Sequence, residues 1–543
     1  MSEIGNSKSQ ILLPLVLCTG LAVGIFIGSK LGNNNNRFST DVGKDVQKFR
    51  EALSYVQKDY VDQVNTAELV DDAIEHMLTK LDPHSVYIAA KDTSQANESL
   101  RGNFDGIGVE FNIFNDTITV VTPLSGGPSE ALGIRSGDKI VKVDSTIVAG
   151  IGITTADVMR YLKGPRGTEV KVTIVRRGEN NPLEYTIVRD KIPTYSVDVA
   201  YMVDKEIGYI KVSRFAATTY TEFEAALKKL KEQGMQKLVL DLQGNPGGYM
   251  DMAINMLDDF LPAGNKIVFT KGKAGRYDQD AFATAKGTFE QGSLIVLVNE
   301  GSASASEIVA GALQDNDRAL VVGRRTFGKG LVQTTFNLNG GAEMRLTISR
   351  YFTPSGRSIQ KPYEDGDEYD RDIISRYNNG EFFHADSIKF NDSLKYVTQN
   401  GRTVYGGGGI MPDYFVSLDT TLNSHYLNEL YVSNAINEYT FDYADKHRSE
   451  LEKMGWENFY TKFEVSDAML NDLVAAGKRA KVNPDYKELK DRKRIFQIHV
   501  KAQVARKIWS NEGFFPIFNE TNEVFLQAIK MFDRMPELNR QKL

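Results

Sequence analysis

Residues Asn299 to Gln333, NEGSASASEIVAGALQDNDRALVVGRRTFGKGLVQ, decide how the rest of the chain is interpreted. An apolar strand, Leu294 to Val298, is predicted to run into the small-residue turn Gly301 to Ser306, and a helix follows. A serine at such a strand-to-helix corner can hold its hydroxyl clear of the backbone, near the amide N–H groups of the first helical turn. Downstream, Lys329 stands between two glycines in the segment TFGKG and is a candidate general base.

Both signals have ordinary explanations when taken singly. The turn holds three serines, Ser302, Ser304 and Ser306, and a serine before a helix often serves only as its N-cap. A Ser-His-Asp triad needs a histidine beside the nucleophile, and residues 191–360 contain none. Lysine is therefore the base that remains. It acts only when neutral, so burial must lower its pKa from about 10.4 toward about 7–8.

Length and composition exclude several classes of protein. A chain of 543 residues is too long for one core and predicts about three domains. The net charge of −6 gives no electrostatic case for a nucleic-acid partner. The single cysteine, Cys18, lies in the apolar N-terminal segment, and the six histidines are scattered without an HExxH pattern. We therefore expect no cofactor, no metal and no cysteine nucleophile.

The N-terminus predicts a membrane segment. After a stub at 1–10, residues 11–28 include the uncharged run ILLPLVLCTGLAVGIFI, at the short end of what spans a bilayer. No small-residue cleavage site follows it, so an uncleaved transmembrane helix is the first interpretation and a cleaved secretory signal the alternative. Residues 29–43 are interpreted as a linker to the membrane anchor.

A helical region is predicted at 44–102. Apolar residues at helical spacing indicate helices over Asp45–Asp62 and Thr66–Leu81, and the second ends at the segment LDPHS, where proline stops it. His84 in that segment is interpreted as a loop histidine that bonds backbone, in preference to a catalytic histidine.

Residues 103–190 change to short strands. The segment GIGVEF at 106–111 and the segment GDKIVKV at 137–143 together resemble a PDZ domain of the bacterial protease-associated kind. Such a domain binds a peptide C-terminus as an added strand, with the terminal carboxylate held by backbone N–H groups. The resemblance implies peptide binding at Gly106, Ile107, Gly108 and Val109. The alternative is a small β-domain that only packs.

The remaining chain divides into a core and two additions. Strands and helices alternate over 191–361, and the segment YGGGGIMPD returns the chain to the same core at 404–418, which predicts a layered α/β architecture. Residues 362–403 are acidic and polar and are interpreted as an insertion. Residues 419–543 are predicted to form a helical C-terminal extension, with an accessory or oligomerisation role.

Several motifs occur in the order found in one known family. LDPHS, the PDZ domain, a DLxxNPGG-type segment, SASASE, TFGKG and a closing GGxxPD element resemble the carboxyl-terminal processing proteases, which are tail-specific serine endopeptidases with a Ser-Lys dyad. The resemblance implies Ser304 as nucleophile, Lys329 as general base and Gln333 as the residue that orients the lysine. It implies a crotonase-like α/β fold that carries an inserted PDZ domain.

An oxyanion hole is also expected for acyl transfer. Ala305, which follows the nucleophile, is one expected N–H donor, and Gly247 or Gly248 of the segment NPGG is the other. The chain departs from the simplest relatives in Gln243-Gly244, in the insertion and in the long helical extension. None of these departures alters the dyad.

The leading hypothesis is a serine endopeptidase that cleaves proteins near their C-terminus, with the PDZ domain recognising the tail and gating the site. A catalytically inactive, membrane-anchored PDZ scaffold is the alternative, and an acyl-CoA enzyme with the same layered core is a third. The resemblance implies a bacterial envelope protease, anchored in the inner membrane with a periplasmic catalytic domain. Expected partners are protein C-terminal tails and the membrane, with a homo-oligomer or adaptor contact through the extension.

Overall fold

The computed structural model describes residues 40–124, 126–176, 178–284, 287–363, 366–388, 391–419 and 424–538. Contacts divide the chain into two units, Met1–Lys80 and Leu81–Leu543. The predicted membrane segment at 11–28 lies outside the described residues. Within the described ranges, no helix has both the length and the apolar character needed to cross a bilayer.

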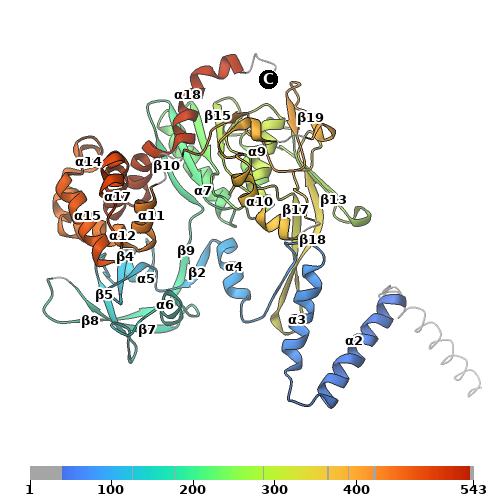
Figure 1. Ribbon diagram of the computed structural model, residues 1–543, viewed down its shortest axis with the longest axis horizontal. Coiled ribbons are helices and arrows are strands. Elements are labelled where there is room, and N and C mark those ends of the chain that lie inside the picture. The colour runs from blue at the N-terminus through green and yellow to red at the C-terminus, as the bar shows by residue number, and fades with distance from the viewer. Residues whose placement is uncertain are drawn as a thin grey trace, which may run out of the picture. The chain divides into compact units, whose positions relative to one another are not determined.

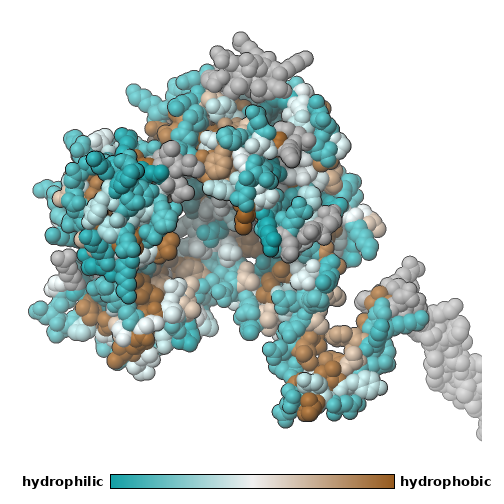
Figure 2. Space-filling view, viewed as in Figure 1, coloured by the Kyte–Doolittle hydropathy of each residue, from teal (hydrophilic) through white to brown (hydrophobic). Residues whose placement is uncertain are grey.

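From residue 40 on, where the structure describes it, the first unit contains the helices α2 (Thr40–Asp59) and α3 (Thr66–Thr79). Asn65 begins α3, because its side-chain oxygen accepts hydrogen bonds from the N–H groups of Ala67 and Glu68. Hydrophobic side chains remain exposed on both helices, as the brown atoms in Figure 2 show.

A six-stranded sheet forms the centre of the second unit (Figure 1). Its strands, in spatial order, are β10 (Val197–Met202), β11 (Ile207–Val212), β12 (Lys237–Asp241), β15 (Ser293–Val298), β16 (Leu320–Gly323) and β21 (Tyr414–Phe415). Strands β10 and β11 are antiparallel, and the other neighbours are parallel. The apolar strands of such a sheet require cover on both faces.

Alternate residues of these strands point to opposite faces. Leu238 and Leu240 pack into one buried cluster with the helices α7 (Thr219–Glu232), α8 (Met250–Asp258) and α9 (Ala305–Asp315). Val239 points the other way and packs with α18 (Glu523–Leu538), which lies over β15 in Figure 1. The last helix of the predicted C-terminal extension therefore completes the core.

A five-stranded antiparallel sheet lies beside this core. Its members are β1 (Val86–Ile88), β13 (Lys266–Gly272), β14 (Gln279–Phe282), β17 (Leu331–Asn337) and β18 (Glu343–Phe352). Strand β1 directly follows the segment LDPHS, and its pairing with β18 brings that segment beside β17.

A separate small sheet contains the strands of the predicted PDZ region. Its strands are β3 (Val109–Phe114), β4 (Thr117–Pro123), β5 (Lys139–Val143), β6 (Thr146–Ile147), β7 (Glu169–Val175) and β8 (Leu183–Val188). Two short helices, α5 (Pro128–Ala131) and α6 (Thr155–Leu162), accompany it. Strands β2 (Asn103–Gly106) and β9 (Asp190–Pro193) pair where the chain enters and leaves, after α4 (Thr93–Arg101).

The polar insertion and the extension both contain regular structure. The insertion forms α10 (Gly366–Asn378) and a hairpin of β19 (Lys395–Val397) and β20 (Thr403–Tyr405). The extension has its own buried cluster under a largely hydrophilic surface (Figure 2). Its helices before α18 are α11 (His425–Val432), α12 (Ala435–Lys446), α13 (Arg448–Met454), α14 (Trp456–Lys462), α15 (Asp467–Arg479), α16 (Tyr486–Asp491) and α17 (Lys493–Phe518).

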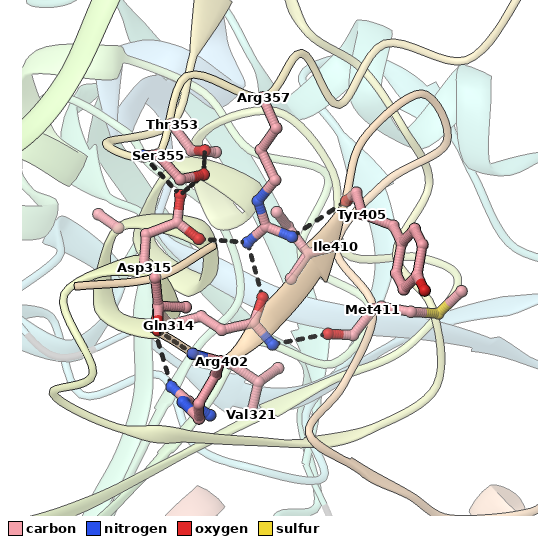
Figure 3. A network of polar contacts seen from close by, with 12 residues as sticks. Gln314, Asp315, Val321, Thr353, Ser355, Arg357, Arg402, Tyr405, Ile410 and Met411 are labelled. Atoms are coloured by element: carbon pink, nitrogen blue, oxygen red, sulfur yellow. Dashed lines mark hydrogen bonds and ion pairs between the residues drawn. The ribbon is translucent and has the colours of Figure 1, made fainter. Parts of the chain in front are cut away.

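A buried polar network holds the C-terminal end of α9 (Figure 3). The fully buried Arg357 donates to Asp315 at 2.7 Å, to the side chain of Gln314 at 2.7 Å and to the Tyr405 carbonyl at 3.1 Å. Ser355 donates to the other Asp315 oxygen at 2.7 Å. The network joins α9 to the segment after β18 and to the end of β20.

Replacing Arg357 tests this network. Arg357→Ala leaves the Asp315 carboxylate buried without its cation, and we expect the free energy of unfolding of the core to fall by about 3–5 kcal/mol. Arg160→Ala, which breaks the exposed pair between Arg160 and Asp157, should change it far less. Urea denaturation measures both variants, and equal effects would contradict a structural role for the buried pair.

Candidate active site

Ser304 occupies a strained corner between β15 and α9. Its φ of 54° is positive, which is rare for a residue other than glycine and typical of a serine held on a sharp turn. Ser302 and Ser306 are fully buried, and their hydroxyls donate to the carbonyls of Leu242 and Asn245. Ser304 is partly exposed, so it is the serine of this turn that a substrate can reach.

The predicted glycine turn lies directly against this corner. A Cβ on Gly247 would stand 2.7 Å from the Ser304 Cβ and 2.9 Å from the Ala305 nitrogen. A Cβ on Gly248 would stand 2.1 Å from the Phe215 carbonyl oxygen, and the φ of Gly248 is 145°. Both positions therefore need glycine, because no side chain fits the approach of the two turns.

The N–H groups at the corner differ in their partners. The Gly247 N–H donates to the Asn245 side-chain oxygen at 2.9 Å. Within the described ranges, neither the Ala305 N–H nor the Gly248 N–H has a hydrogen-bond acceptor. Of the three predicted oxyanion donors, the structure leaves Ala305 and Gly248 available.

One buried carboxylate joins the serine corner to the lysine loop. Glu307, in the first turn of α9, accepts hydrogen bonds from the N–H of Ser304 at 2.8 Å and the N–H of Lys329 at 2.9 Å through one oxygen. Its other oxygen accepts from the Thr326 hydroxyl at 2.5 Å and the Gly328 N–H at 2.7 Å. Burial raises the pKa of Glu307 to about 7, although each of these hydrogen bonds favours the ionised form.

A second residue bridges the same two segments. The hydroxyl of Tyr351, on β18, lies 3.1 Å from the Ser304 carbonyl and 2.9 Å from the Lys329 carbonyl. The positions of Ser304 and Lys329 are therefore coupled through a carboxylate on one side and a phenol on the other.

The predicted contact between Lys329 and Gln333 is present. Lys329 Nζ donates to Gln333 Oε1 at 3.2 Å, and Gln333 Nε2 donates to the His84 carbonyl. In the described structure, no hydrogen bond joins Lys329 Nζ to Ser304. The structure thus brings Ser304, Lys329 and Gln333 into one site without closing the serine–lysine contact.

The surroundings of Lys329 favour its neutral form. Burial lowers the pKa of Lys329, and among the described residues it forms no ion pair with a carboxylate. Lys361, close by, differs because its ammonium pairs with Asp372 at 3.2 Å and lies 4.1 Å from the centre of the Phe327 ring. A buried lysine without a counter-ion is the better general base.

His84 makes closer contacts with the site than the sequence predicts. Its ring bonds a side chain, the hydroxyl of Tyr369 at 2.7 Å, so the prediction that the ring bonds backbone is wrong. Asp82 accepts from the N–H groups of His84 and Ser85 and fixes the loop that carries them. His84 reaches this position because β1, which follows it, pairs with β18, a strand far away in the sequence.

The predicted peptide-binding residues run from the end of β2, at Gly106, to the start of β3, at Val109. Gly108 has a φ of 74°, and the Ile107 carbonyl accepts hydrogen bonds from the hydroxyl and the N–H of Ser129. Strand β3, which begins at Val109, pairs only with β4 among the described strands. Its other edge can accept an added strand.

Glu307, Asn245, Tyr351 and Tyr369 also contribute to the site, and none of them was predicted as a site residue. Glu307 was detectable, because Ser304-Ala305-Ser306-Glu307 fits the S-x-x-E pattern of a helix start. Asn245 lies in the quoted segment NPGG, and its side chain accepts from the Gly247 N–H two residues on. Tyr351 and Tyr369 carry no local signal, since their contacts depend on how distant segments meet.

Four family models match the chain. Residues 206–371 match peptidase family S41, and residues 119–176 match a PDZ domain. Residues 28–93 match the N-terminal domain of the activating protease CtpB, and residues 426–510 match a family of unknown function. These matches define the class: a serine-type peptidase that carries a PDZ domain.

Relatives place the chain within that class. It is 38% identical over 345 residues to a carboxy-terminal-processing protease of Bartonella bacilliformis, covering 63% of this chain and 78% of that protein. It is 33% identical over 352 residues to the carboxy-terminal processing protease CtpA of Bacillus subtilis, covering 65% and 74%. The solved photosystem II D1 C-terminal processing protease is 30% identical, with 58% and 83% covered and a TM-score of 0.34. The chain belongs to peptidase family S41, the carboxy-terminal processing proteases.

Replacing Glu307 tests the coupling of the two segments. In Glu307→Gln an amide NH₂ faces two N–H or O–H donors, so at least two hydrogen bonds are lost and both segments shift. We expect kcat to fall by about tenfold or more in steady-state peptidase assays. Glu224→Gln, the same change at an exposed position of α7, should have no effect. An unchanged kcat in Glu307→Gln would contradict the coupling.

Proposed function

We propose that this peptidase cleaves protein substrates near their C-terminus with Ser304 as nucleophile and Lys329 as general base. Two observations carry the proposal: the partly buried Lys329 amine forms no ion pair among the described residues, and the Lys329 backbone N–H is tied through Glu307 to the serine corner. The inactive-scaffold alternative has no support from the family matches. An acyl-CoA enzyme does not explain a PDZ domain.

The reaction follows from these positions. Neutral Lys329 takes the proton of the Ser304 hydroxyl as Oγ attacks the scissile carbonyl carbon. The tetrahedral oxyanion accepts hydrogen bonds from the Ala305 and Gly248 N–H groups. Collapse breaks the C–N bond, the leaving amine takes the proton from Lys329, and the acyl group stays on Ser304. Water, deprotonated by Lys329, then hydrolyses the ester.

Gln333 orients the base. A neutral lysine amine keeps three N substituents and one lone pair, so an N–H donated to Gln333 Oε1 leaves the lone pair free to face Ser304. The closing of the gap between Lys329 Nζ and Ser304 belongs to the substrate-bound state. We propose that tail binding to the PDZ domain favours that state, which makes the domain a gate as well as a recognition site.

Other parts of the proposal concern architecture and location. The layered core supports a crotonase-like fold with an inserted PDZ domain, because helices α7, α8 and α9 cover one face of a largely parallel sheet. The bacterial envelope location, the membrane anchor at 11–28 and an oligomer or adaptor contact through residues 419–543 stay predictions. Fractionation of cells that express the full chain tests the location.

Two substitutions test the dyad. Ser304→Ala and Lys329→Ala should each abolish cleavage of an unstructured substrate with a free C-terminal tail, because one lacks the nucleophile and the other the base. Lys228→Ala, on the exposed face of α7, should cleave at the wild-type rate. Cleavage products are followed by mass spectrometry. Full activity in Ser304→Ala would show that another residue is the nucleophile.

The pH dependence tests the protonation state of Lys329. Only the neutral amine accepts a proton, so kcat/KM should rise with pH as Lys329 is deprotonated. Since burial lowers this pKa, half of the rise should occur below pH 10.5, the ordinary value for lysine. A rate that falls over the same range would require a protonated group and would contradict lysine as base.

The PDZ loop is tested with matched substrates. Gly108→Ala places a Cβ about 2.9 Å from Ile192 at a positive φ, so the loop must shift. We expect KM to rise severalfold for a substrate with a free terminal carboxylate and to stay constant for the same substrate with an amidated terminus. Equal KM changes for both substrates would show that the loop does not recognise the terminal carboxylate.

A further inference from the structure

Helix α10, in the predicted polar insertion, is hydrogen-bonded to the segment before Lys329. The Arg376 guanidinium donates to the carbonyls of Arg325 at 2.7 Å and Thr326 at 3.0 Å, directly before the segment FGKG. Lys361 Nζ donates to the Tyr369 carbonyl of the same helix at 3.0 Å. The helix is thereby held against the segment that carries the proposed base.

Tyr369 links this helix to the segment LDPHS. Its ring meets Phe327 edge to face at a centroid distance of 6.0 Å, and its hydroxyl lies 2.7 Å from His84 Nε2. The rings of Tyr369 and His84 are also edge to face at 5.6 Å. Burial lowers the pKa of His84 to about 4, so at neutral pH an uncharged ring makes this hydrogen bond.

The path continues from His84 to Lys329. The His84 N–H donates to Asp82 at 2.8 Å, and the His84 carbonyl accepts from Gln333 Nε2. The opposite side of that amide, Gln333 Oε1, faces Lys329 Nζ at 3.2 Å. The His84 carbonyl therefore determines the orientation of the Gln333 amide, because a flipped amide would place its own oxygen against the His84 carbonyl oxygen.

We propose that Tyr369 is a positioning residue for the peptidase reaction: its hydroxyl fixes His84, whose carbonyl sets the Gln333 amide that directs Lys329. Tyr369 touches neither the substrate nor the reacting atoms. The inference rests on the proposed roles of Lys329 and Gln333. It assigns to the insertion, through α10, control over the orientation of the base.

The first test removes only the Tyr369 hydroxyl. Tyr369→Phe keeps the ring contacts with Phe327 and His84, so the fold should be retained, and a thermal melt checks this. We expect kcat to fall about fivefold with KM unchanged, because the loss affects the base and not substrate binding. Tyr377→Phe, the same change at a half-exposed position of α10, should keep the wild-type kcat.

The second test is a double-mutant cycle with Gln333. If Tyr369 acts through Gln333, the fall caused by Tyr369→Phe should disappear when Gln333 is already alanine. Single-turnover measurements at high enzyme concentration keep the slow variants within range. A general structural effect of the tyrosine would lower the rate equally in both backgrounds.

The outcomes separate this inference from the proposed function. A wild-type kcat in Tyr369→Phe, or equal losses in both backgrounds, overturns the positioning role while inactive Ser304→Ala and Lys329→Ala variants leave the dyad intact. Activity in Lys329→Ala overturns the proposed base itself. A selective loss in Tyr369→Phe that vanishes in Gln333→Ala supports the inference.

Discussion

The Glu307 carboxylate is the interaction on which the site depends. It is buried in the first turn of α9 and accepts four hydrogen bonds. Two come from the backbone N–H groups of Ser304 and Lys329, and two come from the Thr326 hydroxyl and the Gly328 N–H. An ionised carboxylate in an apolar core is costly unless all its acceptor sites are used. That requirement fixes the distance between the serine corner and the lysine loop, which local sequence preferences alone would leave free.

The environments of two lysines show how the same side chain takes different roles. Lys361 is buried among aromatic rings but pairs with Asp372, so it stays a charged structural cation. Lys329 is partly buried and, among the described residues, forms no ion pair; its amine donates to the uncharged Gln333 amide. Burial lowers the pKa of both amines, and the presence or absence of a carboxylate decides which one is suited to proton transfer.

The sequence predicted the parts of the site that local pattern encodes. The serine corner, the glycine turn and the Lys329–Gln333 spacing are short-range features, and the structure brings these residues together. The position of His84 beside β17 was not predictable, because it depends on β1 pairing with β18, a strand far away in the sequence. The role of the insertion could not be predicted for a related reason: α10 is mostly polar, and Tyr369 is one of its few buried side chains.

The cover that α18 provides has a consequence for synthesis. The strands β11, β12, β15 and β16 leave the ribosome long before residues 523–538 do, and until then one face of their sheet lacks its apolar partner. Contacts between such distant segments form slowly and late. The face of the sheet that α18 covers is therefore the last part of this core to acquire its apolar partner during synthesis.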